Sequence, residues 1–130
     1  VANGWKAGLD FFEKAVEAAE PNQQIVAKED LGIAKAAWLH FASVANQVRF
    51  VLARDSIRDR HVTPAEKQRL VAEINSILNN EITLAKALFE ITRSDSRIGF
   101  EASNQYYYVP QDLIEKVINC EFIRSQLGAM

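Results

Sequence analysis

Apolar residues recur at steps of three and four along most of the chain, the spacing of one face of an α-helix. The first such stretch runs from Trp5 to about Ala19 and ends at Pro21. The second runs from about Ala27 to Ile57, with an apolar stripe formed by Leu31, Ala34, Trp38, Phe41, Ala45, Val48 and Leu52 and widened by Ala37, Val44 and Val51. Because this stripe is too wide for one partner, we expect the second helix to contact at least two others.

A third helix is predicted to begin at Thr63-Pro64-Ala65-Glu66, which combines an N-cap threonine, proline at the first helical position and a glutamate that completes a capping box. Apolar residues then continue at helical spacing to about Thr92 or Arg93. The short connection 58–62 predicts an antiparallel hairpin with the second helix. Pro110 opens a last helix, and we find no convincing strand. The predicted fold is all-α, one antiparallel helical bundle of two long and two shorter helices spanning residues 1–130.

The segment 94–109 departs from the helical pattern. It holds all three tyrosines, Tyr106, Tyr107 and Tyr108, together with residues of mixed chemistry: Arg97, Gly99, Phe100, Glu101 and Asn104. Such a long non-helical segment is usually functional or disordered, and clustered aromatics are untypical of disorder, so we expect an ordered loop. Three interpretations remain open: a structural cover in which Arg97 pairs with Glu101, a contact with a neighbouring domain, or a ligand site in which aromatic faces stack on sugars.

Composition narrows the classes of function. A length of 130 residues, 48% hydrophobic and 25% charged, fits one globular domain. A net charge of −2 provides no global field for nucleic acid, and the apolar runs are too short for membrane insertion. The single cysteine, Cys120, excludes an intramolecular disulfide and is expected in the core. Because the chain begins Val-Ala-Asn-Gly, without Met, we expect a processed product or a domain excised from a larger protein, and we favour the excised domain.

Three further polar residues are candidates for buried sites: His40, Arg49 and Glu81. Glu81 falls within the apolar stripe of the third helix, where a carboxylate must be paired or have a raised pKa. Glu81 is either an acid with a functionally shifted pKa, or an edge residue satisfied by a neighbour such as Arg49 or His40, or a residue at a bundle end that water reaches. The two histidines of the chain do not have the sequence spacing that is typical of metal ligands. We therefore predict no metal and no cofactor, and we assign no catalytic residue.

The run from Asp95 to Tyr108, with Pro110 and Leu113-Ile-Glu-Lys-Val-Ile-Asn-Cys120, resembles the C-terminal helical region of large bacterial glycoside-hydrolase-like proteins of the Bacteroidetes type. Two earlier blocks, Trp5-x-x-Gly8-Leu9 and the run from Leu39 to Phe50 with Arg54-Asp55, are similar to the same region. The resemblance covers nearly the whole chain. It implies an exported protein acting on carbohydrate, periplasmic, cell-surface or secreted, whose catalytic centre lies in an upstream barrel.

Our leading hypothesis is therefore an accessory helical domain that docks on the missing upstream domain through the 94–109 loop. A carbohydrate-binding module using the same loop, or a stand-alone protein-interaction bundle, are the alternatives. An intrinsic enzyme would require Glu81, His40 and Glu101 to converge on one pocket.

Overall fold

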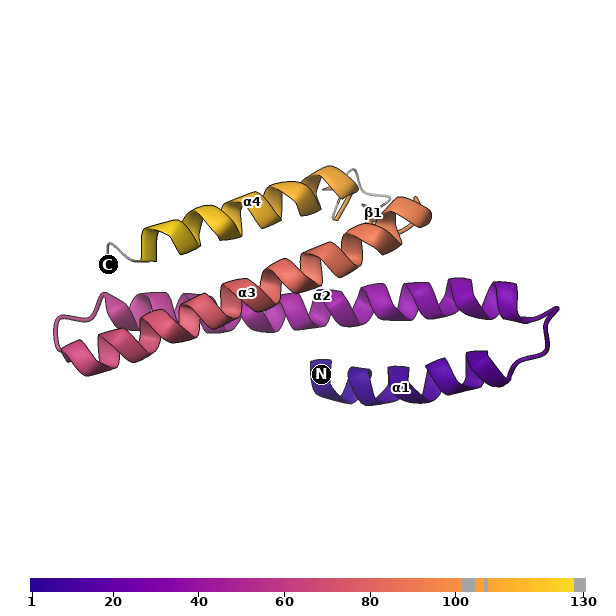
Figure 1. Cartoon of the computed structure of the whole chain (residues 1–130), viewed down its shortest axis with the longest axis horizontal. Coiled ribbons are helices and arrows are strands. Elements are labelled where there is room, and N and C mark those ends of the chain that lie inside the picture. Colours follow the sequence, from indigo (N-terminus) through magenta and orange to yellow (C-terminus); the bar gives the residue numbers. More distant parts are fainter. Residues whose placement is uncertain (102–104, 107, 128–130) are drawn as a thin grey trace.

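The computed structural model describes residues 1–101, 105–106 and 108–127, and of residues 100, 101, 105 and 106 it describes the backbone alone. Across this part of the chain four helices follow one another: α1 (Ala2–Ala18), α2 (Gln24–Ile57), α3 (Pro64–Ser94) and α4 (Pro110–Leu127). Two short strands, β1 (Phe100–Glu101) and β2 (Gln105–Tyr106), lie between α3 and α4 (Figure 1).

The helices pack in the order of the sequence, α1 on α2, α2 on α3 and α3 on α4. Figure 1 shows α1 beside the N-terminal half of α2, with the N terminus near the middle of the longer helix. Trp5 fixes this contact, because its indole Nε1 donates to the carbonyl of Ala34 at 2.9 Å and its ring centre lies 5.2 Å from that of Phe41. The predicted bundle of two long and two shorter helices is confirmed, as are the two neighbours of the second helix.

The apolar stripe predicted for α2 is only partly buried. Beyond the reach of α1, Val48 is 55% exposed and Leu52 63%, and Val44 and Val51 are also exposed. The face that α2 turns to α3 carries five buried residues instead: Ala36, Leu39, Ser43, Asn46 and Ala53. The reason is geometric. The 31-residue α3 packs along α2, whereas the 17-residue α1 covers one half of it.

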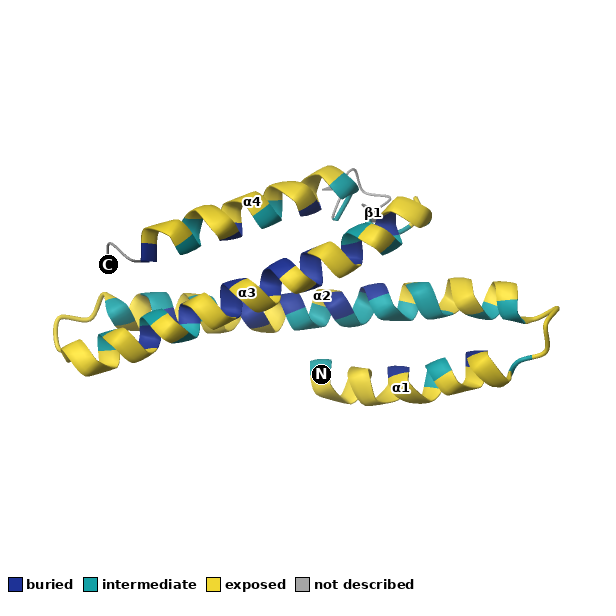
Figure 2. Ribbon diagram, in the orientation of Figure 1, coloured by how far each residue is buried: buried dark blue, intermediate teal, exposed yellow. Residues whose placement is uncertain are grey.

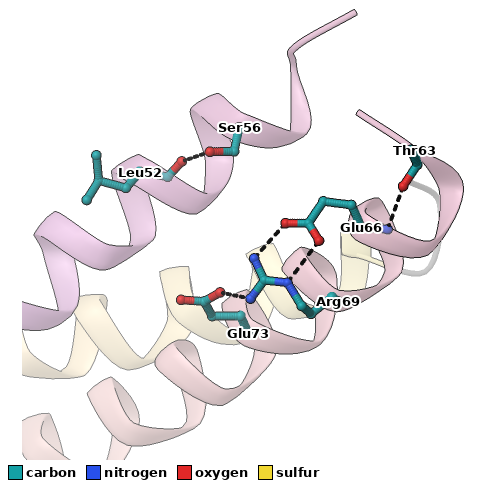
Figure 3. Close-up of polar contacts among 6 residues, drawn as sticks. All are labelled: Leu52, Ser56, Thr63, Glu66, Arg69 and Glu73. Atoms are coloured by element: carbon teal, nitrogen blue, oxygen red, sulfur yellow. Dashed lines mark hydrogen bonds and ion pairs between the residues drawn. The ribbon is translucent and has the colours of Figure 1, made fainter. Parts of the chain in front are cut away.

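The start of α3 follows the predicted cap. Thr63 has an extended backbone and its hydroxyl accepts a hydrogen bond from the amide of Glu66 at 3.2 Å (Figure 3). Pro64 is the first helical residue. The Glu66 carboxylate pairs with Arg69 at 2.7 Å, and Arg69 also pairs with Glu73 at 3.2 Å. The threonine half of the capping box is therefore present, and the glutamate half is replaced by a surface ion pair.

The segment after α3 contains a small hairpin that the sequence reading did not predict. Gly99 has a φ of 90°, which glycine adopts without strain, and β1 then pairs with β2 in antiparallel register. Phe100 lies opposite Tyr106, and Glu101 opposite Gln105. The hairpin brings the chain back to the start of α4 at Pro110.

The core consists of two apolar clusters built from α2, α3 and α4. One gathers around Leu70, Ile74 and Leu78, and the other around Leu39, Leu88 and Leu113. Figure 2 shows buried residues along most of α3, which lies between α2 and α4. Polar residues lie between the two clusters on two of the helices, Ser43 and Asn46 on α2 and Lys116 on α4. Cys120 is buried in the first cluster, as expected.

Candidate functional site

Tyr108 joins the hairpin segment to the helices. Its φ is 65°, a left-handed conformation that costs an ordinary residue about 1 kcal/mol and that persists only where surrounding contacts hold it. Its hydroxyl lies 2.7 Å from Nδ1 of His40, and the two rings meet edge to face at 5.5 Å. Nζ of Lys116 lies over the Tyr108 ring, 5.4 Å from its centre. Burial, and then the charge of Glu81, raise the pKa of the Tyr108 hydroxyl.

Glu81 lies at the centre of a polar layer between the two apolar clusters. Its Oε1 accepts a hydrogen bond from the Ser43 hydroxyl at 2.5 Å and faces Nζ of Lys116 at 2.6 Å. Its Oε2 accepts from Nδ2 of Asn46 at 2.8 Å. Both carboxylate oxygens are thus bonded, and the negative charge is balanced by an ammonium on α4. We name Ser43, Asn46, Glu81 and Lys116 the polar layer, which ties α2, α3 and α4 together.

The polar layer extends from the core to the surface at both ends. At one end the Arg49 guanidinium donates to Oδ1 of Asn46, and Asn46 donates to Oδ1 of Asn80 at 2.9 Å. Arg49 therefore supports Glu81 through Asn46, whereas the direct partner is Lys116. At the other end Nζ of Lys116 lies over the Tyr108 ring, and the Tyr108 hydroxyl contacts the exposed side chain of His40. Glu81 has neighbours that satisfy its charge, but it is buried at 6% exposure and does not lie at an edge, and its partners are Lys116, Ser43 and Asn46 instead of Arg49 or His40.

Arg97 is held by carboxylates of the two adjoining elements. Its Nε and one terminal nitrogen donate to the two oxygens of Asp95 at 2.8 and 2.6 Å, and Glu29 of α2 lies 3.6 Å away. The hydrogen bonds from the side chain and the backbone amide of Arg97 lower the pKa of the Asp95 carboxyl to about 2. The pairing of Arg97 with Glu101, part of one interpretation of the sequence, falls outside the described residues, because only the backbone of Glu101 is described.

A cavity of about 470 Å³ opens between α2, α3 and the segment before α4. Its floor is apolar, and three of the residues singled out in the sequence share it: His40, Arg97 and Tyr108. The other lining residues are Ile33, Ala36, Ala37, Phe41, Leu88 and Ile98. We name this surface the loop-side face. The backbones of Phe100, Glu101 and Tyr106 lie in the adjoining hairpin, and Asn104 and Tyr107 fall outside the described residues.

Sequence reasoning missed Ser43, Asn46 and Lys116 as site residues. A signal was present, because Ser43 and Asn46 interrupt the run Leu39, Phe50 and Ala53 at helical spacing. The stronger apolar stripe on another face of α2 concealed it. Lys116, between Leu113 and Cys120, carried the same signal on α4.

The described residues give no support to a metal centre, since no three of their His, Cys, Asp or Glu side chains are grouped so as to hold an ion. Among the same residues, no helix has the length and hydropathy needed to cross a membrane.

Comparisons with protein-family models, with curated proteins and with solved structures each found no match.

Proposed function

We propose that this chain is an accessory helical domain of a bacterial carbohydrate-degrading protein, and that it docks on another protein domain through the loop-side face. The observation that carries the docking is the meeting of His40, Arg97 and Tyr108, from distant parts of the sequence, around one apolar cavity. An apolar centre rimmed by Tyr and Arg is the composition that protein interfaces favour. The carbohydrate context rests on the resemblance of the sequence alone.

The backbone of the face supports the same proposal. Tyr108 keeps its left-handed conformation, and Arg97 is oriented by two hydrogen bonds to Asp95. Side chains that are fixed before binding lose less conformational entropy when a partner arrives. A face whose aromatic and cationic groups are already held in place is therefore suited to recognition.

Accessibility of Arg97 tests the docking, with Arg69 as a matched control. The two side chains are 64% and 60% exposed, and each is paired with two carboxylates. In the isolated domain, phenylglyoxal should modify both at comparable rates. In the protein isolated natively from its host, modification of Arg97 should slow several-fold while that of Arg69 is unchanged. An Arg97 rate equal in the two samples would count against docking at this face.

Carbohydrate binding at the same cavity is the second candidate. Phe41 and Tyr108 offer ring faces, and His40 and Arg97 offer hydrogen-bond donors beside them. Titration with a panel of oligosaccharides, followed by the NMR signals of the Ile33 and Ile98 methyl groups, distinguishes the two candidates. Saturable shifts confined to these methyls would assign the cavity to sugar, and their absence at millimolar ligand would remove this candidate.

A further inference from the structure

A second hollow surface runs between α2 and α4, on the stretch that begins at the polar layer and leads to the α2–α3 turn. It consists of two adjoining hollows of about 340 and 250 Å³ that share Phe50, Arg54 and Ile123. We name them together the α2–α4 groove. Along α2 the groove reaches from Asn46 to Arg58, about 18 Å at the helical rise per residue.

The floor of the groove is apolar and belongs to the core. It is formed by side chains of all three helices: Phe50, Ile57, Ile74, Ile77, Leu78, Cys120, Ile123 and Leu127. Taken together, the two hollows fall within the range of small-molecule sites, roughly 300–1,000 Å³, which lie preferentially between helices in bundles.

More cationic than anionic side chains line the groove. Four are cationic, Arg54, Arg58, Lys67 and Lys116, and one is a carboxylate, Glu81. Lys116 is paired with Glu81 and Arg54 with Asp55. Arg58 and Lys67, at the end near the α2–α3 turn, are in no ion pair with the described residues. The free positive charge of the groove therefore lies at that one end.

A side chain crosses between the two helices at the inner end of the groove. Lys116 of α4, which lines the groove, donates a hydrogen bond to Ser43 of α2 at 2.9 Å. An extended alkyl chain is thinner than an α-helix with its side chains, which measures about 10 Å across. Burial of such a chain on the apolar floor is favourable by about 0.8 kcal/mol per CH₂ group.

We propose that the α2–α4 groove binds a single-chain amphiphile with an anionic head group. The head group pairs with Arg58 and Lys67, and the alkyl chain lies over Phe50 and Ile123 towards Cys120. The site is separate from the loop-side face and does not depend on the docking function. Its ligand class is defined by an alkyl chain and a carboxylate, sulfate or phosphate.

Dodecyl sulfate below its micelle concentration is the probe, with dodecyltrimethylammonium as the matched cationic control. NMR signals of the Ile57, Ile74 and Ile123 methyls should shift saturably with the sulfate and much less with the ammonium, while the exposed Ile25 methyl stays unchanged. Dodecanoate and dodecyl phosphate should reproduce the result and rank the head groups. Equal affinity for both signs of charge, or shifts spread over the whole protein, would overturn the proposal.

Charge variants test the contact with the head group separately from the contact with the alkyl chain. R58Q with K67Q, both at the α2–α3 turn, should weaken dodecyl sulfate binding roughly two- to twentyfold. The control K14Q with K28Q removes the same charge from α1 and the start of α2 and should leave the affinity unchanged. Ile123→Trp, which fills the shared part of the groove, should also abolish binding while the helical CD spectrum persists. Binding of an acidic Leu/Glu model helix but not of the sulfate would instead assign the groove to a protein partner and contradict the proposal.

Discussion

The Tyr108 hydroxyl and Nδ1 of His40 lie 2.7 Å apart, across 68 positions of sequence. This contact fastens the segment before α4 to the middle of α2. Replacing Tyr108 with Phe removes the hydroxyl and retains the ring, so the free energy of unfolding should fall by about 0.5–1.5 kcal/mol in urea denaturation. In a double-mutant cycle with His40→Leu, most of this loss should appear as coupling between the two residues. Additive losses would show that the contact contributes nothing to stability.

Glu81 should be the most sensitive residue of the polar layer. Glu81→Leu leaves the ammonium of Lys116, a quarter exposed, without its carboxylate and should cost about 3 kcal/mol or more. The double variant Glu81→Leu with Lys116→Met removes both charges and should recover most of that stability. Thermal or urea unfolding of the three proteins measures the difference. A double variant as unstable as the single one would mean that the ion pair itself stabilises the fold. The cost of Glu81→Leu would then not come from leaving Lys116 without a partner.

The Asp95–Arg97 contact predicts a dependence of stability on pH. The folded pKa of Asp95 is lowered to about 2 from 3.8, so the folded state binds its proton less readily than the unfolded state. The resulting stability is fully present above about pH 3.8 and is lost as the pH falls towards 2. NMR titration of the Asp95 carboxyl carbon gives the pKa directly. Arg97→Ala should move this pKa back towards 3.8, and an unchanged value would refute the assigned cause.

The N-cap of α3 can be tested with two threonines of the same helix. Thr63→Ala removes the acceptor for the Glu66 amide and should destabilise the protein by about 0.5–2 kcal/mol. Thr83 is exposed within the helix and donates to the carbonyl of Asn79, so Thr83→Ala should be neutral or slightly stabilising. Equal effects of the two substitutions on the urea midpoint would mean that the cap is not a significant source of stability.

The helices could be predicted from the sequence because their signals are local. Thr63 and Pro64 mark the beginning of α3 through the chemistry of two neighbouring residues, and Pro110 marks that of α4 in the same way. The packing face of α2 could not be predicted, because the more apolar face of the helix is not the one that meets α3. Ser43 and Asn46 are buried at 4% and 1% exposure because Glu81 and Lys116, far away in sequence, supply their partners.

The sequence offers Arg97 and Tyr108 as parts of one non-helical segment and His40 as a separate polar candidate, and the structure places the three around one cavity. Their meeting depends on Tyr108 at a φ of 65° and on the turn through Gly99. Such a conformation for tyrosine is held by tertiary contacts, which no local pattern encodes.

The docking proposal is tested most directly by a photoreactive residue placed on the loop-side face in the natural host. Benzoylphenylalanine at position 98 lies on that face, and at position 122 it replaces an exposed phenylalanine of α4 outside it. The proposal predicts that position 98 cross-links to a defined surface of a carbohydrate-degrading catalytic domain, with little product from position 122. Equal, diffuse cross-linking at both positions, or a defined product with a protein unrelated to carbohydrate, would contradict it.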